Sequence, residues 1–422
     1  MRDHEFRQSL NDELHGRPGL SVHAPARITH LAFTITEADP DPGENLRQLC
    51  NALGLRPPQQ DAHHHAVEID GGLLKYERHG EFYRISVTAI GNDTGQEAIA
   101  KLPMGWIEDL PGQRLVAIHT HILAKSAKAP STRFLATLFS DVDMACSKTN
   151  QGKATIWTDF RIGADGYTRM LIHDHGLSPT RLGRLSRRLH EIETYRMMAL
   201  LAFPLARQLQ QELGPLERSL GSTVNEMLTV SGADEDAKLL HQLSGIARDV
   251  EDMSNRFSYR IAAARAYATL VDKRLAELNE VRVMNYQRLG VFLERRFSPA
   301  MTTCNAVGDR INGLAARSER ASNLLRTRVD IALEGQNQQL LRSMEQRARQ
   351  QLMLQQTVEG LSVVAISYYS IGIAGKLIEG LASWMPWLDV KLASVISIPL
   401  IIALVWAGVA RVRRRIHHAS TP

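Results

Sequence analysis

The sequence predicts an α+β cytoplasmic domain, then a long α-helical region with coiled-coil-like spacing, and finally a C-terminal transmembrane hairpin of two helices. Three observations predict this architecture: short β-branched segments between turns, helical periodicity after them, and two uncharged apolar runs near the C-terminus. We expect an α/β domain at residues 1–176, a long-helix region at 177–358, the transmembrane hairpin at 359–410 and a basic cytoplasmic tail at 411–422.

Six segments of the N-terminal region have the composition of β-strands. They are rich in β-branched and aromatic residues and are separated by glycine turns: ARITHLAFTI, HAVEID, LLKYERH, EFYRISVTAI, LVAIHTHILA and KATIWTDFRI. We expect a mixed or antiparallel sheet. GENLRQLCNALG and residues 133–147 have helical patterns, and we expect these helices to pack on one face of the sheet.

The helical region begins at LSPTRLGRL, where Ser178 is a suitable N-cap and Pro179 occupies the first helical position. We expect a buried helix kinked at Pro204. Further on, apolar residues recur in steps of four and three, which is coiled-coil spacing, before Arg282 and Asn285 interrupt them. The residues of this seam are Phe257, Ile261, Ala264, Ala268, Val271, Leu275 and Leu278.

A last long helix is expected to begin near Pro299 and to continue without proline to the membrane. One apolar stripe follows it: Val307, Ile311, Leu314, Ala321, Leu325, Val329, Leu333, Leu340 and Met344.

Two apolar runs predict the membrane hairpin. The run from Leu392 to Ala410 has nineteen uncharged residues, which at 1.5 Å per residue match a hydrocarbon thickness of roughly 30 Å. The run from Gly360 to Gly375 is shorter, but beyond Lys376 the apolar residues resume, and a lysine there can extend its charge to the interface. We interpret the pair as two membrane spans, with Trp384 and Trp387 at the interface.

Basic residues predict the orientation of the hairpin. Arginines precede the first span and follow the second, at Arg342, Arg347, Arg349, Arg411, Arg413, Arg414 and Arg415, whereas the connector has only Lys376 and Lys391. The positive-inside rule places both termini in the cytoplasm. The polar N-terminus has no secretory signal. We therefore expect a multi-pass protein of the cytoplasmic (inner) membrane, with the lipid bilayer as a partner.

Cysteine spacing, net charge and the motifs that are missing argue against several classes of function. The three cysteines form no CxxC pair, so neither a disulfide framework nor a thiolate zinc site is predicted. The formal net charge is only +5, much of it in the tail RVRRRIHH, which favours a membrane surface over nucleic acid. No Walker loop, GxGxxG, HExxH or GxSxG motif occurs, so we predict no cofactor and no catalytic residue.

Four blocks resemble a known family: LNDELHGRP with APARITHLAF, KYERHGEFYRI, LSPTRLGRLSRRLHEIETYRMMALLAFPLAR and LLRSMEQRARQQLMLQQTVEGLSVVAISYYSIGI. They look like a bacterial family of uncharacterised membrane-anchored proteins, which implies an anchor but no activity. The layout is also similar to that of CorA-type divalent cation channels. Those channels carry a Gly-Met-Asn motif after the first span, where this sequence has YYSIGIAGKLIEG.

Charged residues around one glycine turn are candidates for a ligand or partner site. Glu77, Arg78, His79 and Glu81 place acids, a base and a cation together in KYERHGEFYRI. The alternative, which we prefer, is a set of cross-strand ion pairs at a hairpin.

Histidines supply two further candidates. His119 and His121 share one face of a predicted strand, as metal ligands must, but the sequence identifies no third ligand, so ordinary hydrogen-bonded histidines are the favoured alternative. His15 and Arg17 suit recognition of an anion or a partner, or equally a capped helix followed by a loop.

The first span carries polar and small residues that differ from the uniformly apolar second span. Ser367, Ser370, Gly372 and Gly375 suit helix packing or a pore.

The function predicted from these features is a non-enzymatic, membrane-anchored scaffold or sensor. It would form a homo-oligomer and present its α/β domain to a small-molecule or ion ligand or to a partner. The alternative is a CorA-like divalent cation channel or transporter. A third possibility is an enzyme whose site lies around Glu77, His79 and His119 in the α/β domain.

Overall fold

The structure is a computed structural model that describes residues 3–8, 11, 21–60, 62–91, 95–139, 143–382 and 389–419. By its internal contacts the chain divides into two units, Met1–Asn323 and Leu324–Pro422. The first unit contains a sheet and helices, and the second contains the C-terminal helices. The finer division at residues 176, 358 and 410 stays a prediction.

The first unit is built on a mixed sheet of nine strands in the order β2-β3-β4-β1-β5-β8-β7-β6-β9. β5 and β8 pair in parallel, and the other neighbouring strands pair antiparallel. The strands are β1 (Ala26–Thr34), β2 (His64–Ile69), β3 (Gly72–Arg78), β4 (Phe82–Ile90), β5 (Gln113–Leu123), β6 (Ala145–Thr149), β7 (Ala154–Ile162), β8 (Thr168–Asp174) and β9 (Val281–Arg282). The predicted mixed α/β domain is confirmed.

The six predicted strands are present as β1 to β5 and β7, whereas β6, β8 and β9 were not predicted. The helix expected at residues 133–147 is wrong in its second half. α4 (Thr132–Leu138) begins where the Ser131 side chain accepts a hydrogen bond from the Phe134 N–H, but Phe139 is already extended and β6 follows. The short polar segment ACSKT pairs with the adjacent β7 as a hairpin and with β9, which comes from a distant part of the chain.

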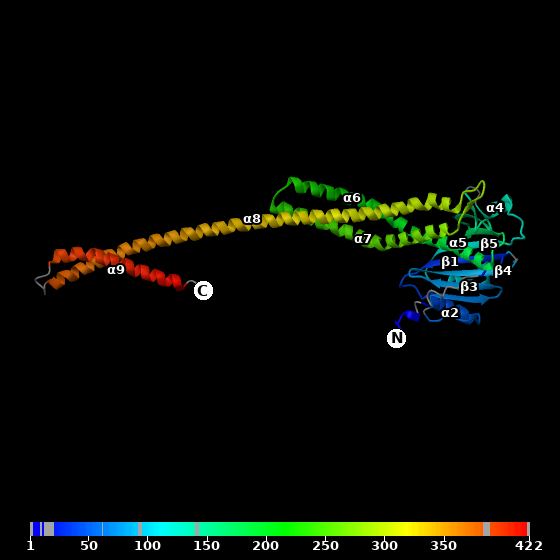
Figure 1. Cartoon of the computed structure of the whole chain (residues 1–422), viewed down its shortest axis with the longest axis horizontal. Helices are drawn as coiled ribbons and strands as arrows, with labels where there is room; N and C mark the ends of the chain where they lie inside the picture. The colour runs from blue at the N-terminus through cyan, green and yellow to red at the C-terminus, as the bar shows by residue number, and fades with distance from the viewer. Residues whose placement is uncertain are drawn as a thin grey trace. The chain divides into compact units, whose positions relative to one another are not determined.

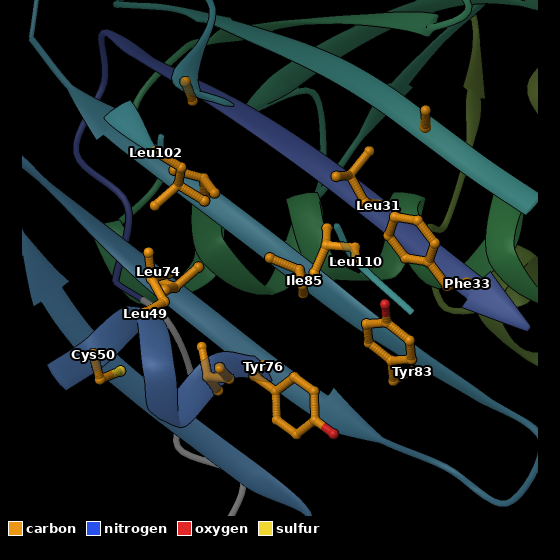
Figure 2. Packing of buried hydrophobic residues seen from close by; sticks show 14 of the residues in the cluster. Leu31, Phe33, Leu49, Cys50, Leu74, Tyr76, Tyr83, Ile85, Leu102 and Leu110 are labelled. Atoms are coloured by element: carbon orange, nitrogen blue, oxygen red, sulfur yellow. The ribbon is translucent and has the colours of Figure 1, made fainter. Parts of the chain in front are cut away.

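Helices cover both faces of the sheet, so the expected one-face arrangement is wrong (Figure 1). α2 (Pro42–Ala52), η1 (Ala98–Lys101) and α3 (Met104–Glu108) pack on one face. Figure 2 shows Leu49 of α2 beside the strand residue Leu74, in the same cluster as Cys50. α5 (Pro179–Leu200) lies on the other face, where its Thr194 hydrogen bonds to His30 of β1. The reason is visible in β4, which is buried at eight consecutive residues and so needs cover on both sides.

A helical bundle continues from α5 through α6 (Ala202–Thr229), α7 (Ala233–Ala276) and the first part of α8 (Leu289–Ala382) (Figure 1). The kink expected at Pro204 lies slightly earlier, at Leu201 between α5 and α6. Pro204 then falls in the first turn of α6, where a missing N–H costs little.

α8 begins at Leu289, so the expected start near Pro299 is wrong and Pro299 lies inside the helix. Two side chains accept hydrogen bonds from the first N–H groups of α8: Ser147 Oγ from Leu289 at 3.1 Å and Glu280 Oε2 from Gly290 at 3.0 Å. These long-range caps fix the start of the helix and could not be read from its local sequence.

The predicted apolar seam of α7 is mostly buried, and its buried members are Phe257, Ile261, Ala264, Val271 and Leu278. A Cβ added at Gly308 of α8 would lie 3.7 Å from Ile261 and from Phe257, so α7 and α8 are in close contact. The helix ends at Ala276, and Arg282 belongs to β9, so the two polar residues do not interrupt a helical seam. A supercoil stays a prediction.

The second unit contains the rest of α8 and α9 (Val390–Ala419). Two helices, within Leu289–Leu381 and Lys391–Arg411, contain segments long and apolar enough to cross a membrane. Within the described residues, 6% of the apolar segment of α8 and none of that of α9 is buried. Trp384 and Trp387, expected at the interface, lie outside the described residues.

Candidate functional site

An ion-pair network lies between the sheet and α5. Glu77 on β3 lies opposite Arg84 on β4, and its carboxylate is 2.6 Å from Arg84 Nε and 3.0 Å from Lys75 Nζ. Lys75 and Glu77 point to the same side because alternate residues of a strand share a face. All three side chains are only 4% exposed. Charges at this depth are stable only when they are paired.

Two helices complete the network. Glu191 of α5 accepts a hydrogen bond from Arg187 Nε at 2.9 Å, one turn earlier, and from Arg274 Nε of α7 at 2.5 Å. Arg84 reaches the same carboxylate at 3.5 Å and thereby joins it to Glu77. We call Lys75, Glu77, Arg84, Arg187, Glu191 and Arg274 the α5 network. It connects two strands to two helices.

The carboxylates of the α5 network are held in their charged form. Burial opposes ionisation of Glu77, but Arg84 and Lys75 outweigh it and lower the pKa of the carboxyl to about 2. Burial likewise opposes ionisation of Glu191, and the surrounding arginines lower its pKa. Burial lowers the pKa of Lys75 against the effect of Glu77. The basic side chains of the α5 network therefore stabilise the charged form of its two carboxylates.

Two buried histidines lie beside the α5 network. The rings of His30 and His190 stack with centroids 4.7 Å apart. His30 hydrogen bonds to Ser86 Oγ at 2.8 Å and to Thr194 Oγ1 at 3.1 Å, and His190 to Thr120 Oγ1 at 2.9 Å. Burial lowers the pKa of both imidazoles, that of His190 to about 3. Both rings are therefore neutral at physiological pH.

A small cavity is enclosed by the α5 network and these histidines. Its volume is about 20 Å³, and Lys75, Glu77, Arg84 and His190 are among its walls. A space of this size holds about one water molecule. The α5 network therefore positions α5 and α7 on the sheet. Its charged side chains pair with one another across this small space.

The predicted histidine pair lies on the opposite face, under η1. His121 Nε2 is 2.8 Å from Glu97 Oε1, and His119 Nδ1 is 3.6 Å from Glu97 Oε2. His119 also hydrogen bonds to Thr29 Oγ1 at 3.0 Å and stacks on Tyr167 at 3.9 Å. Burial lowers the pKa of His119 to about 4, although Glu97 raises it. The described part of the chain contains no group of three or more His, Cys, Asp or Glu residues suited to hold a metal ion.

Comparison with known proteins places nearly the whole chain in one family. The sequence model of a family described as "Protein of unknown function (DUF3422)" matches residues 2–416. The chain belongs to the DUF3422 family. No curated protein matches it. The resemblance to an uncharacterised family is thereby confirmed.

In this DUF3422 protein, the four residues predicted around the glycine turn separate. Glu77 enters the α5 network and forms a cross-strand pair, as the hairpin interpretation predicts, but the pair is buried. Arg78 reaches Asp41 at 2.5 Å, and His79 stacks on Phe82 at 4.3 Å. Glu81 binds Arg260 of α7 through contacts of 2.6 and 2.9 Å. They do not converge on one ligand site.

The other predicted residues lie apart from the α5 network. Glu77 and His119 are on opposite faces of the sheet, so they do not form a common catalytic site. Ser367, Ser370, Gly372 and Gly375 lie in α8, and a Cβ added at either glycine would meet open space. His15 and Arg17 lie outside the described residues.

Sequence reasoning missed most of the α5 network in this DUF3422 protein. The available signal was two charged residues, Lys75 and Glu77, on alternate positions of a strand, on either side of Tyr76. On α5, Arg187 and Glu191 are spaced by one helical turn. Neither signal identifies Arg274, or Arg84 as the link between the two carboxylates, because these contacts depend on tertiary structure.

Proposed function

We propose that this protein is anchored in the bacterial inner membrane by two C-terminal spans and presents its sheet domain in the cytoplasm. One observation carries the proposal: the apolar segments of α8 and α9 are almost wholly exposed in the described chain. An apolar helix in the core of a soluble protein would be buried, and a signal sequence would lie near the N-terminus. A bilayer accounts for both segments.

The proposed role is that of an oligomeric, non-enzymatic scaffold or sensor. The apolar stripe of α8 supports assembly, because Leu314, Ala321 and Leu325 are buried whereas Leu333 and Leu340 are 53% and 60% exposed. A second copy of the chain would cover this exposed continuation. The α5 network supports a scaffold role, since it fixes the helices firmly on the sheet.

Reporter fusions in the short connector and at the C-terminus test the topology. We expect a periplasmic signal from a fusion after Trp387 and a cytoplasmic signal from one after Pro422, because arginines flank the hairpin on its outer sides. A cytoplasmic signal at Trp387 contradicts the hairpin. Extraction of the intact protein by alkaline carbonate contradicts the spans altogether.

A CorA-like channel is the second candidate function, favoured by the polar Ser367 and Ser370 in the first span. Native mass measurement in detergent distinguishes it from the scaffold. A pentamer favours the channel, whereas a dimer contradicts it.

A further inference from the structure

A second cavity lies where β7, α5 and α8 meet within the first unit. Its volume is about 160 Å³. The apolar part of its wall comes from all three elements: Phe160, Leu200, Phe292, Leu293 and Phe297. A volume of about 150 Å³ is enough for one benzene ring. We call this space the Phe160 cavity.

Three arginines line the Phe160 cavity, and two of them are already paired with carboxylates. Arg196 donates two hydrogen bonds to Glu193, at 2.9 and 2.5 Å, and Arg296 donates one to Asp143 at 2.8 Å. Arg161 is exposed, and within the described part of the chain its guanidinium has no carboxylate partner. An arginine beside a partly apolar space is suited to hold a planar anion through paired hydrogen bonds.

The wall at Phe160 has an unusual backbone. Its φ is 55°, in the left-handed region that a bulky residue rarely adopts. The pairing of β7 with β8 shifts register between Thr158 and Ile162, so Phe160 lies in a bulge. Thr158 Oγ1 accepts the Phe160 N–H at 3.2 Å, and the Phe160 ring stacks on Phe292 at 5.3 Å. Such strain persists where the surroundings hold it, and it is concentrated at ligand sites.

The geometry points to the Phe160 cavity as a binding site for a small carboxylate with a compact ring or a branched apolar body. The apolar body fills the space between Phe160, Leu200 and Phe292, and the carboxylate binds Arg161. Asp159 also lies in the wall, but its Oδ1 accepts the backbone N–H of Arg161 at 3.1 Å.

A small carboxylate would be the ligand of the proposed sensor. The binding site itself does not depend on that role, but its biological purpose rests on it. Phe292 lies near the start of α8, the helix whose later part carries an apolar segment. Binding and membrane insertion are measured separately, so the failure of one leaves the other standing.

Calorimetric titration of the full-length protein in nanodiscs with benzoate, and with the uncharged benzamide, tests the site. We expect benzoate to bind with a millimolar or lower Kd and benzamide to bind about tenfold or more weakly, because the charged hydrogen bonds to Arg161 are lost. Arg161→Gln should weaken benzoate binding by a similar factor. Arg133→Gln is the matched control, since Arg133 is an exposed arginine away from the cavity and should change nothing.

A Leu200→Trp variant should abolish binding by filling the cavity, and near-ultraviolet circular dichroism checks that it folds. Three results overturn the proposal: no benzoate binding up to millimolar concentration, equal affinity for benzamide, or an Arg161→Gln variant that binds as the native protein does. Because Arg161 is at the surface, its substitution tests the site even if the tryptophan variant fails to fold.

Discussion

Replacing Glu77 with Gln should destabilise the sheet domain strongly. The substitution leaves Lys75 and Arg84, each 4% exposed, without their shared counter-charge. Breaking a buried ion pair from one side costs roughly 3–5 kcal/mol. The pKa gives a similar magnitude: a lowering from 4.5 to about 2 corresponds to about 3 kcal/mol at 1.36 kcal/mol per pKa unit.

The same pair makes the free energy of unfolding depend on pH. The pKa of Glu77 is lower in the folded chain, so its stabilising contribution is complete above pH 4.5 and is lost as the pH falls from 4.5 through about 2. The Glu77→Gln variant lacks this contribution at every pH. The difference between native protein and variant should therefore shrink in acid.

Urea unfolding of the full-length protein in detergent, followed by near-ultraviolet circular dichroism of the buried Trp157, measures both effects. We expect the midpoint to fall by about 1 M or more, given a slope of about 1–3 kcal/mol per molar urea. The control is Asp252→Asn, since Asp252 pairs with Arg256 but is 66% exposed; an exposed pair contributes under about 1 kcal/mol. Equal midpoint shifts for the two variants would refute the reasoning.

Three further outcomes are expected. Deleting residues 357–422 should release a fragment that stays in the supernatant when membranes are pelleted in high salt, because both apolar segments are removed; a fragment that pellets contradicts this. Gly372→Leu or Gly375→Leu should weaken assembly by roughly 1–3 kcal/mol, measured by cross-linking, because the larger side chain blocks close helix packing. Ala403→Leu in the second span should have a smaller effect. The reverse order would show that the second span, and not the first, faces the inside of the oligomer. Leu340→Asp places a charge on the exposed stripe and should reduce the oligomer in native mass spectra; an unchanged mass excludes the stripe as the interface.

Most of the sheet could be predicted from local sequence, because six strands have β-branched composition and clear turns. β6 could not, since its five residues are short and polar and depend on β7 and β9 for pairing. β9 follows a long helix and has only two residues, so nothing local distinguishes it from a loop. Short strands carry little signal of their own, and the pairing of β9 with β6 is also non-local.

The candidate site was predicted only at Glu77. A charged residue in a hairpin is usually exposed, which is why exposed cross-strand pairs were the natural expectation. The burial of Glu77 depends on α5, which lies more than a hundred residues away and brings Glu191 to Arg84. The Phe160 cavity likewise needs β7, α5 and α8 together, and no motif marks it in the sequence.

The apolar stripe of α8 is buried in its first part and exposed in its later part, where we propose that the chain assembles. Leu314 and Leu325 are completely buried, but Leu333, Leu340 and Met344 are each at least 53% exposed. The residues at these positions are apolar, although they are exposed among the residues that the structure describes. Long stretches of exposed apolar side chains are unfavourable in water, so a soluble monomer would not be expected to retain them. In the proposed assembly, association with a second α8 would remove this exposure, next to the segment that we propose enters the bilayer.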